Sequence, residues 1–304
     1  MLYTPQFYIS VGCAQWIGAR RRQEDCISAG VADGGQQLLV LLADGMGGEE
    51  DGHLAAECVA QNFESEYFSS FNSSSLPCNE RLHQSLLLAN IALGKKKKAR
   101  HIDADAGCTL IALATGQDGL CWLSVGDSLL YRQYGDNVQK LNTAHTWEWE
   151  LARRVVKGTM TAEEAVACPI LPHALFSAVV GENTIAEVER STIHPCRIGE
   201  RYIIASDGLQ PLIDHEWESL LSASDMKEAT SQQAADKLME ALKTLQHREQ
   251  DNASIIVLDI LPPRPAPAAT AASSPVHGGS IAKHLIAMGI LLTLCLCLWL
   301  WIMG

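Results

Sequence analysis

The sequence lacks an excess of positive charge. Its 304 residues hold 23 Lys and Arg against 35 Asp and Glu, which gives a formal net charge of −12. A nucleic-acid-binding protein needs a basic face toward the phosphate backbone, so this balance argues against that function class. The longest basic run is Lys95–Lys98. We interpret it as a solvated loop or helix end rather than a phosphate- or membrane-binding patch.

Cysteine pairs with the spacing of a zinc site are also missing. The chain has 10 cysteines but no Cys-x-x-Cys motif, so no zinc site is expected. Several cysteines lie in apolar runs, where cysteine behaves as a small buried hydrophobe. Residues 1–10, MLYTPQFYIS, lack the charged and apolar regions of a secretory signal. These features predict a main domain in the reducing cytosol.

Charge is absent from residues 285–304, LIAMGILLTLCLCLWLWIMG. About 20 apolar residues in a helix match the ~30 Å hydrocarbon core of a bilayer. The alternative is a buried core helix, but the Pro-, Ala- and Ser-rich segment before it, residues 261–282, predicts a flexible linker that leaves no core to join. We therefore predict a C-terminal transmembrane helix, a tail anchor, over residues 283–304.

The residues that flank this span predict its orientation. Trp299 and Trp301 suit an aromatic anchor at one interface, and Lys283 and Arg264 lie on the N-terminal side. By the positive-inside rule, residues 1–280 are expected in the cytoplasm. The chain is thus predicted to be a single-pass protein of the bacterial inner membrane whose main domain lies in the cytoplasm.

Residues 1–260 read as one α+β domain. Apolar or alternating runs bounded by Gly, Asp or Asn predict strands over 7–14, 37–43, 107–115, 119–125, 128–134, 201–205 and 254–260. The strands predicted over 119–125 and 128–134 are expected to be joined by a turn at the Gly-Asp-Ser sequence between them. Amphipathic stretches predict helices over 52–68, over 79–94 with Gly94 at its end, and around 232–247. Because helices come in blocks between strands, a layered α+β fold is favoured over a doubly wound one.

Carboxylates cluster at the predicted strand ends. Asp44 and Asp207 follow apolar strands in LLADGMGG and IIASDGL, Asp127 lies at a turn, and Asp251 opens a strand; Glu24 and Asp25 are adjacent. Each could be an ordinary Asp-Gly turn. Carboxylates that converge on one rim repel one another, however, and a hard cation such as Mg²⁺ or Mn²⁺ removes the conflict.

Six motifs in order carry a resemblance to a known family: RRRQED, ADGMGG, GCTL, VGDSLLYR, ASDGL and DNASIIV. The series resembles the type 2C (PPM) metal-dependent serine/threonine protein phosphatases, most closely the bacterial members. It spans roughly residues 10 to 258. The resemblance implies two antiparallel β-sheets packed as a sandwich and flanked by helices, with a metal site at one end.

The resemblance also implies roles for single residues. Asp44 would bridge two metal ions, and Asp207 and Asp251 would complete their ligands. The Gly45 carbonyl would help bind one ion, Glu24 would act largely through water beside Asp25, and Asp127 would hold a third ion. Arg20 would bind the substrate phosphate, since its spacing to Gln23 fits the family's Arg-x-x-Asn-Glu-Asp better than that of Arg21 or Arg22. The residues so implied are Arg20, Glu24, Asp25, Asp44, Gly45, Asp127, Asp207 and Asp251.

Some positions depart from the family pattern. Gln23 replaces Asn, Cys108 replaces Thr or Ser, and residues 144–146 read Ala-His-Thr where the family often has Asp-His-Ser. The first two changes are interpreted as minor, whereas residues 144–146 lie, by the resemblance, around the flap over the active site, where a change would alter substrate contacts. We interpret His145 as structural rather than as a general acid, and leave open whether Trp147 and Trp149 anchor a helix or dock a partner. Cys26, His53 and His173 are interpreted as structural.

The resemblance implies hydrolysis of phosphoserine and phosphothreonine in proteins by a metal-activated water, with two Mn²⁺ or Mg²⁺ ions, or three. Its partners would be phosphoprotein substrates and an opposing Ser/Thr kinase. One alternative is a phosphatase-like scaffold that binds phosphoprotein without turnover. Another is a phosphatase for a small molecule or lipid head group.

Overall fold

The computed structural model describes residues 7–32, 37–48, 51–73, 76–116 and 119–263, and the chain divides into two units, 1–263 and 264–304. Nearly all of the predicted linker and the whole predicted anchor lie outside the described residues. Among the helices that are described, none is long and apolar enough to cross a membrane.

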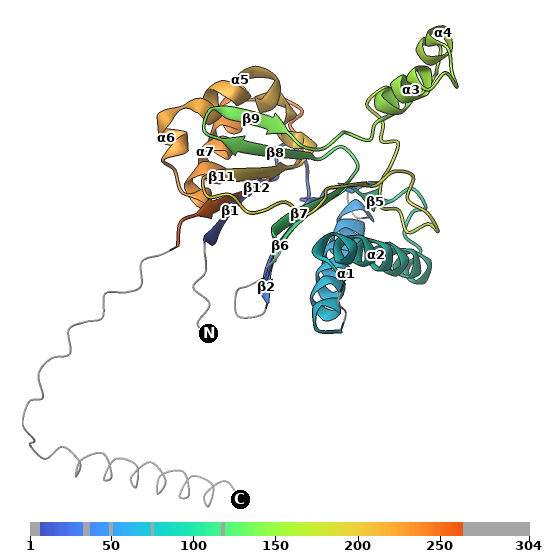
Figure 1. Cartoon of the computed structure of the whole chain (residues 1–304). Coiled ribbons are helices and arrows are strands. Elements are labelled where there is room, and N and C mark those ends of the chain that lie inside the picture. The colour runs from blue at the N-terminus through green and yellow to red at the C-terminus, as the bar shows by residue number, and fades with distance from the viewer. Residues whose placement is uncertain (1–6, 33–36, 49–50, 74–75, 117–118, 264–304) are drawn as a thin grey trace, which may run out of the picture. The chain divides into compact units, whose positions relative to one another are not determined.

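Two five-stranded antiparallel sheets form the centre of the first unit (Figure 1). One sheet has the order β1 (Tyr8–Trp16), β12 (Ala253–Leu261), β11 (Glu200–Ala205), β8 (Leu129–Tyr134) and β9 (Asn137–Lys140). The other has the order β10 (Glu189–Arg190), β7 (Gly119–Val125), β6 (Leu110–Gly116), β3 (Gln37–Ala43) and β2 (Cys26–Ala32). A short ladder pairs β4 (Gly45–Met46) with β5 (Gly107–Cys108).

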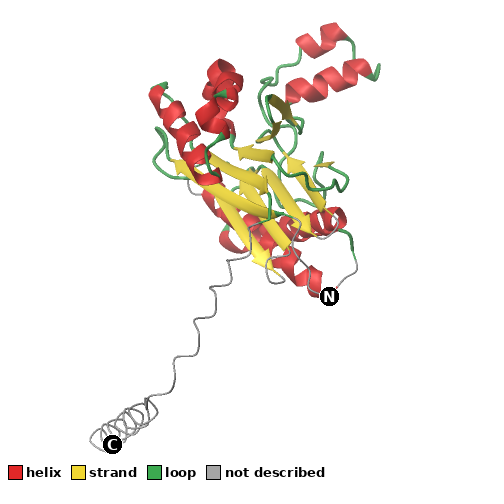
Figure 2. Ribbon diagram, turned by 60° about the vertical axis from the view of Figure 1, so that its left-hand side comes forward, coloured by secondary structure: helices red, strands yellow, loops and turns green. Residues whose placement is uncertain are grey.

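Helices cover the outer faces of both sheets, as Figure 2 shows. The long helices α1 (Asp51–Ser73) and α2 (Cys78–Arg100) pack beside the β3 sheet. The β12 sheet is covered by α5 (Gln210–Ser222), α6 (Ser224–Lys227) and α7 (Ser231–Thr244), which follow the 3-10 turn η2 (Asp207–Leu209). The pair α3 (Trp147–Val156) and α4 (Ala162–Val166) extends away from these layers in Figure 1.

Strand β3 shows why its sequence is a continuous apolar run. Successive side chains of a strand point to opposite faces. Leu39 and Leu41 pack with the helices α1 and α2, whereas Val40 and Leu42 pack between the two sheets. Both faces of the strand are therefore buried, and the predicted sandwich with helical flanks is confirmed.

The helix α2 corrects one prediction. Gly94 does not end it, because the helix continues through the lysine block to Arg100, and His101 follows it in the left-handed conformation (φ 54°). The glycine instead allows a close approach: a Cβ there would lie 2.3 Å from the Gly181 carbonyl oxygen. Within the block, Lys97 Nζ donates to the carbonyls of Ala104 and Ala106 at 2.6 Å each, so this lysine is not merely solvated.

The segment Gly126–Ser128 also differs from a simple turn between paired strands. Strands β7 and β8, which it joins, belong to different sheets. Gly126 adopts a positive φ of 94°, and a Cβ there would lie 2.7 Å from the Thr109 methyl group. Asp127 is thus placed where the chain crosses from one sheet to the other.

Candidate active site

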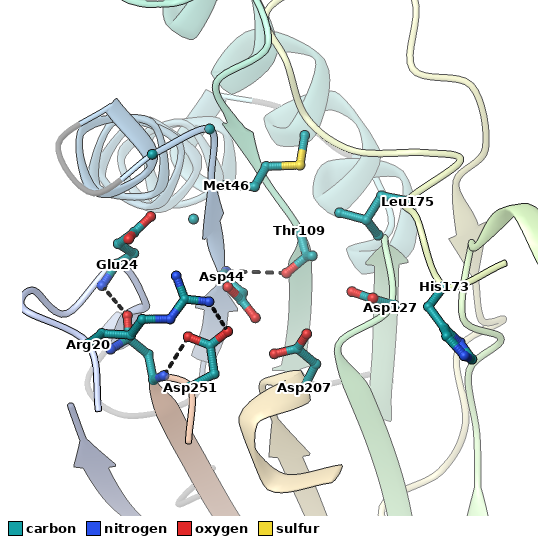
Figure 3. A pocket seen from close by; sticks show the side chains of 14 residues that line it. Arg20, Glu24, Asp44, Met46, Thr109, Asp127, His173, Leu175, Asp207 and Asp251 are labelled. Carbon is teal, nitrogen blue, oxygen red and sulfur yellow. Dashed lines mark hydrogen bonds and ion pairs between the residues drawn. The ribbon is translucent and has the colours of Figure 1, made fainter. Parts of the chain in front are cut away.

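A cavity of about 320 Å³ lies at one end of the sandwich (Figure 3). Every predicted site residue except Asp25 lines it. The further lining residues are Met46, Gly47, Gly48, Thr109, His173, Leu175 and Asn252. The structure therefore brings together side chains from four strand ends and from the segment before β2.

Asp44 lies directly after β3 and is held through its backbone. Its N–H donates to Thr109 Oγ1 at 3.2 Å, and its carbonyl accepts from the Thr109 N–H at 2.9 Å. The Thr109 hydroxyl also lies 2.7 Å from Ser128 Oγ. Thr109, which the sequence did not single out, thus fixes the strand end that carries Asp44.

Asp25 does not line the cavity and is only 5% exposed. Its Oδ2 accepts a hydrogen bond from Ser206 Oγ at 2.9 Å, while its Oδ1 is buried with no hydrogen-bond partner among the described residues. Burial is the main cause that raises the pKa of this carboxyl. An unsatisfied buried carboxylate oxygen is costly unless a cation or a proton compensates it.

Like charges crowd the cavity floor. Burial and then the charges of Asp25 and Asp207 raise the pKa of Asp44 well above its ordinary value. The carboxyl of Asp207 lines the cavity. Desolvation by the surrounding protein, and after it the negative charges of Asp127 and Asp251, raise its pKa to about 7. Such mutual repulsion is what a bound cation relieves.

Glycines keep the floor of the cavity bare. A Cβ at Gly45 would lie 2.5 Å from the Gly52 carbonyl oxygen and 2.8 Å from that of Glu24. Gly47 has a φ of 108° and a Cβ there would meet the Ala106 backbone at 2.4 Å. The backbone after Asp44 therefore requires glycine at these positions and can approach an ion or a phosphate closely.

Asn252 organises the opposite wall. Its Oδ1 accepts from the Glu24 N–H at 2.8 Å, and its Nδ2 donates to the carbonyls of Ile17 and Arg22 at 2.8 and 3.0 Å. It thereby ties the segment of Glu24 to the start of β12. The sequence signal for Asn252 is its place directly after the predicted metal ligand Asp251.

Arg20 lies at the mouth of the cavity. Its Nη2 donates to Asp251 Oδ2 at 2.6 Å, and the two side chains are 49% and 38% exposed. Arg21 and Arg22 do not line the cavity, so the structure selects the same arginine as the motif spacing.

The donor set fits a hard divalent cation. In the part of the chain that the structure describes, no three His, Cys, Asp or Glu side chains are placed closely enough to hold a metal ion together. Magnesium-type ions do not need three such ligands, because they bind through one or two carboxylates and keep several waters. The carboxylates of Asp44, Asp127, Asp207 and Asp251 and the Gly45 carbonyl, all at one cavity, supply oxygen donors of this kind.

Several aromatic residues at the start of α3 and just before it have packing roles. His145 is 1% exposed, and its Nδ1 accepts from the Gly126 N–H at 3.1 Å. Trp147 packs edge-on against Phe176 with ring centroids 5.2 Å apart, and Trp149 packs tilted against His145. The structural interpretation of His145 is confirmed, and the two tryptophans anchor α3.

His173 and Cys26 differ in their surroundings. His173, interpreted from the sequence as structural, is exposed and lies among the residues that line the cavity. Cys26 packs against the apolar core, as expected, and burial raises the pKa of its thiol.

The sandwich of two antiparallel sheets, its helical layers and the acidic cavity define a PPM phosphatase-like fold. Residues 17–250 match the sequence model of the Protein phosphatase 2C family, and the chain belongs to this family.

Two bacterial serine/threonine phosphatases are similar to this chain in sequence. The serine/threonine protein phosphatase PstP of Mycobacterium tuberculosis is 27% identical over 249 residues, which cover 80% of this chain and 43% of PstP. This chain thus spans less than half the length of that relative. The serine/threonine phosphatase stp of Listeria innocua is 24% identical over 230 residues, or 74% of this chain and 85% of stp.

Solved structures share the fold. The crystal structure of M. tuberculosis PstP aligns with a TM-score of 0.64 at 24% identity and covers 83% of this chain and 99% of that one. The catalytic domain of PstP in complex with two manganese ions aligns with a TM-score of 0.64 at 22% identity, over 84% and 99% of the two chains.

Proposed function

We propose that this chain hydrolyses phosphoserine and phosphothreonine in proteins with the help of Mn²⁺ or Mg²⁺. The observation that carries the proposal is the set of crowded carboxylates around one cavity in a member of the protein phosphatase 2C family. Asp44, Asp207, Asp251 and the Gly45 carbonyl would hold two ions. Asp127 would hold a third ion, and Glu24 would contribute through water.

Divalent ions at such a site supply a water of lowered pKa and neutralise charge on the phosphoryl group. The chain supplies the positions. Strand β3 and the two hydrogen bonds between Asp44 and Thr109 hold Asp44 in place. The glycines after Asp44 carry no side chain and so leave room for a phosphate. Asp25, anchored by Ser206, lies behind Asp44 and adds negative charge that favours cations.

Arg20 would bind the substrate phosphate. Its guanidinium is a planar fork that can donate two hydrogen bonds to one phosphoryl group. Because it is half exposed at the cavity mouth, it can turn from Asp251 to an incoming phosphate. No cysteine lines the described cavity, so no thiol is placed to attack phosphorus.

We also propose that the protein is tethered to the cytoplasmic face of a membrane, the bacterial inner membrane, through residues 283–304. The uncharged apolar sequence of that segment supports this. Tethering would raise the local concentration of the enzyme near membrane-bound phosphoproteins and near an opposing Ser/Thr kinase.

Phosphate release from a phosphothreonine peptide tests the activity. The full chain in detergent micelles would be assayed with Mn²⁺ and with EDTA, beside Asp44→Asn and Asp207→Asn. We expect metal-dependent turnover that falls by at least about 100-fold in both variants, since each loses a charged metal ligand. Asp236→Asn, which changes an exposed carboxylate on α7, is the matched control and should keep full activity.

The opposite result has a clear meaning. A folded protein that binds Mn²⁺ but releases no phosphate would favour the scaffold alternative, in which the Ala144–Thr146 departure disables turnover. Release from a small phosphate ester or a lipid head group, but not from the peptide, would favour the small-molecule alternative.

A further inference from the structure

Two buried thiols that do not line the cavity lie side by side. Cys78 begins α2 and Cys121 lies in the middle of β7, 43 residues later, and their Sγ atoms are 2.7 Å apart. The disulfide bond length is about 2.05 Å, so a movement of less than about 1 Å would bring the sulfurs to bonding distance. Both residues are free cysteines in the structure, with 4% and 0% exposure.

The surroundings of the pair favour reaction at one sulfur. The Tyr67 hydroxyl lies 3.4 Å from Cys78 Sγ. The guanidinium of Arg81, itself 4% exposed, donates to the Tyr67 hydroxyl at 3.3 Å and lies over the Tyr67 ring at 4.9 Å. A buried positive charge next to a thiol stabilises the thiolate, which is the reactive form of cysteine.

The protonation of Cys78 agrees with this geometry. The hydrogen bond from Cys121, and after it those from Tyr67 and Arg81, lower the pKa of the Cys78 thiol to about 7 against the opposing effect of burial. The same contact raises the pKa of Cys121. Cys78 is therefore the nucleophile of the pair, and Cys121 the thiol that would resolve it.

We propose that Cys78 and Cys121 form a reversible disulfide when the protein meets a hydroperoxide. The Cys78 thiolate attacks the peroxide O–O bond, which gives a sulfenic acid at Cys78 and releases hydroxide, or an alkoxide from an organic peroxide. The Cys121 sulfur then attacks Cys78 Sγ, and the S–S bond forms as water leaves. Two thiols are oxidised, one peroxide is reduced, and a small thiol reductant reverses the reaction.

The bond would join α2 to the sheet beneath it. Both cysteines belong to the apolar core between the helices and the β7 face. A disulfide that closes a loop of this length restricts the unfolded chain, so oxidation is expected to raise Tm by roughly 5 to 10 °C. Neither cysteine lines the catalytic cavity, so the proposal is independent of the phosphatase activity.

Peptide mapping of the full chain tests the proposal. Protein treated with hydrogen peroxide or with dithiothreitol would be alkylated, digested and analysed by mass spectrometry without reduction. We expect a cross-linked peptide that joins Cys78 to Cys121 and is two hydrogens lighter than the reduced pair, and a higher Tm in the oxidised sample. Cys13, which is exposed, shows by its own oxidation that the peroxide dose was sufficient.

Variants assign the order of the two steps. In Cys121→Ser, dimedone should label a sulfenic acid at Cys78, whereas in Cys78→Ser no label should appear at Cys121. Cys58→Ser is the matched control, because Cys58 has the same 4% exposure, and it should retain the cross-link. If Cys13 is oxidised in the native chain and no Cys78–Cys121 peptide forms, the proposal is wrong, whether or not the variants fold.

Discussion

Arg20 shows how a single residue can be tested against near-identical neighbours. It lines the cavity and pairs with Asp251, whereas Arg21 and Arg22 are exposed elsewhere. We expect Arg20→Gln to lower kcat/KM for a phosphothreonine peptide by roughly 10- to 100-fold, mainly through a higher KM, because a charge-assisted bond to the phosphate is lost. Arg21→Gln is the matched control and should change kcat/KM less than about twofold. Equal losses in both variants would contradict the assignment.

His145 predicts a pH dependence of stability. Burial, and after it the charge of Arg153, lower the pKa of this imidazole from 6.5 to about 4. Between these pH values the unfolded chain binds a proton that the folded chain does not. The free energy of unfolding should therefore decrease as the pH falls through this window, by about 2 kcal/mol at pH 5.

A neutral substitute isolates this contribution. His145→Asn can still accept a hydrogen bond from the Gly126 N–H, which His145 Nδ1 accepts at 3.1 Å. Urea unfolding of both proteins at pH 8 and pH 5 gives the comparison. We expect the native protein to lose about 2 kcal/mol more than His145→Asn between these pH values. Parallel losses would show that His145 is protonated in the folded state.

At the scale of single elements, Gly94 in α2 is a position where helix propensity and tertiary packing favour different residues. Gly94→Ala should stabilise an isolated helix by about 1 kcal/mol. In the protein the new Cβ would lie 2.3 Å from the Gly181 carbonyl, and Gly181 is held by a hydrogen bond from its N–H to Asn90 Oδ1 at 2.8 Å. We therefore expect a net destabilisation of about 1 to 3 kcal/mol in urea unfolding.

A second position on the same helix provides the control. Gln84 is exposed, so Gln84→Ala should change the free energy of unfolding by less than about 0.5 kcal/mol. If Gly94→Ala proved more stable than the native chain, the contact between α2 and Gly181 would not limit this site.

The same helix shows what local sequence could and could not predict. Long apolar runs such as β3 and β12 were identified within about two residues, because burial on both faces leaves a continuous signal. Gly94 was assigned to a helix end because its partner, Gly181, is distant in the sequence. The strands β2, β9 and β10 were missed, since they are short or half exposed and carry little apolar pattern.

In the candidate site too, local patterns were predictable from the sequence, whereas contacts between distant segments were not. Asp44, Asp207 and Asp251 stand at strand ends, so their convergence followed from the strand pattern and the family motifs. Thr109 and Asn252 act through backbone contacts between segments far apart in sequence, which no local pattern reveals. The Cys78–Cys121 pair also depends on the packing of α2 against β7.

At the scale of the whole chain, the described unit stabilises itself. One apolar cluster lies between the sheets, and two others join each sheet to its helices. Residues 7–263 therefore supply a complete set of layers for a folded domain. The membrane role of residues 283–304, which lie outside the described residues, is proposed from their sequence alone.

Cell fractionation tests that role. The full chain, expressed in bacteria, should remain in the membrane pellet after alkaline carbonate extraction, whereas residues 1–263 should appear in the supernatant. Two charges in the middle of the span, Leu294→Lys with Leu296→Lys, should also release the chain, because each lysine costs about 3 kcal/mol at the bilayer centre. Alanine at the same two positions is the matched control and should remain in the pellet. A full chain that carbonate extracts completely, or that resists protease added to the cytoplasmic side of inverted vesicles, would contradict the tether or its orientation.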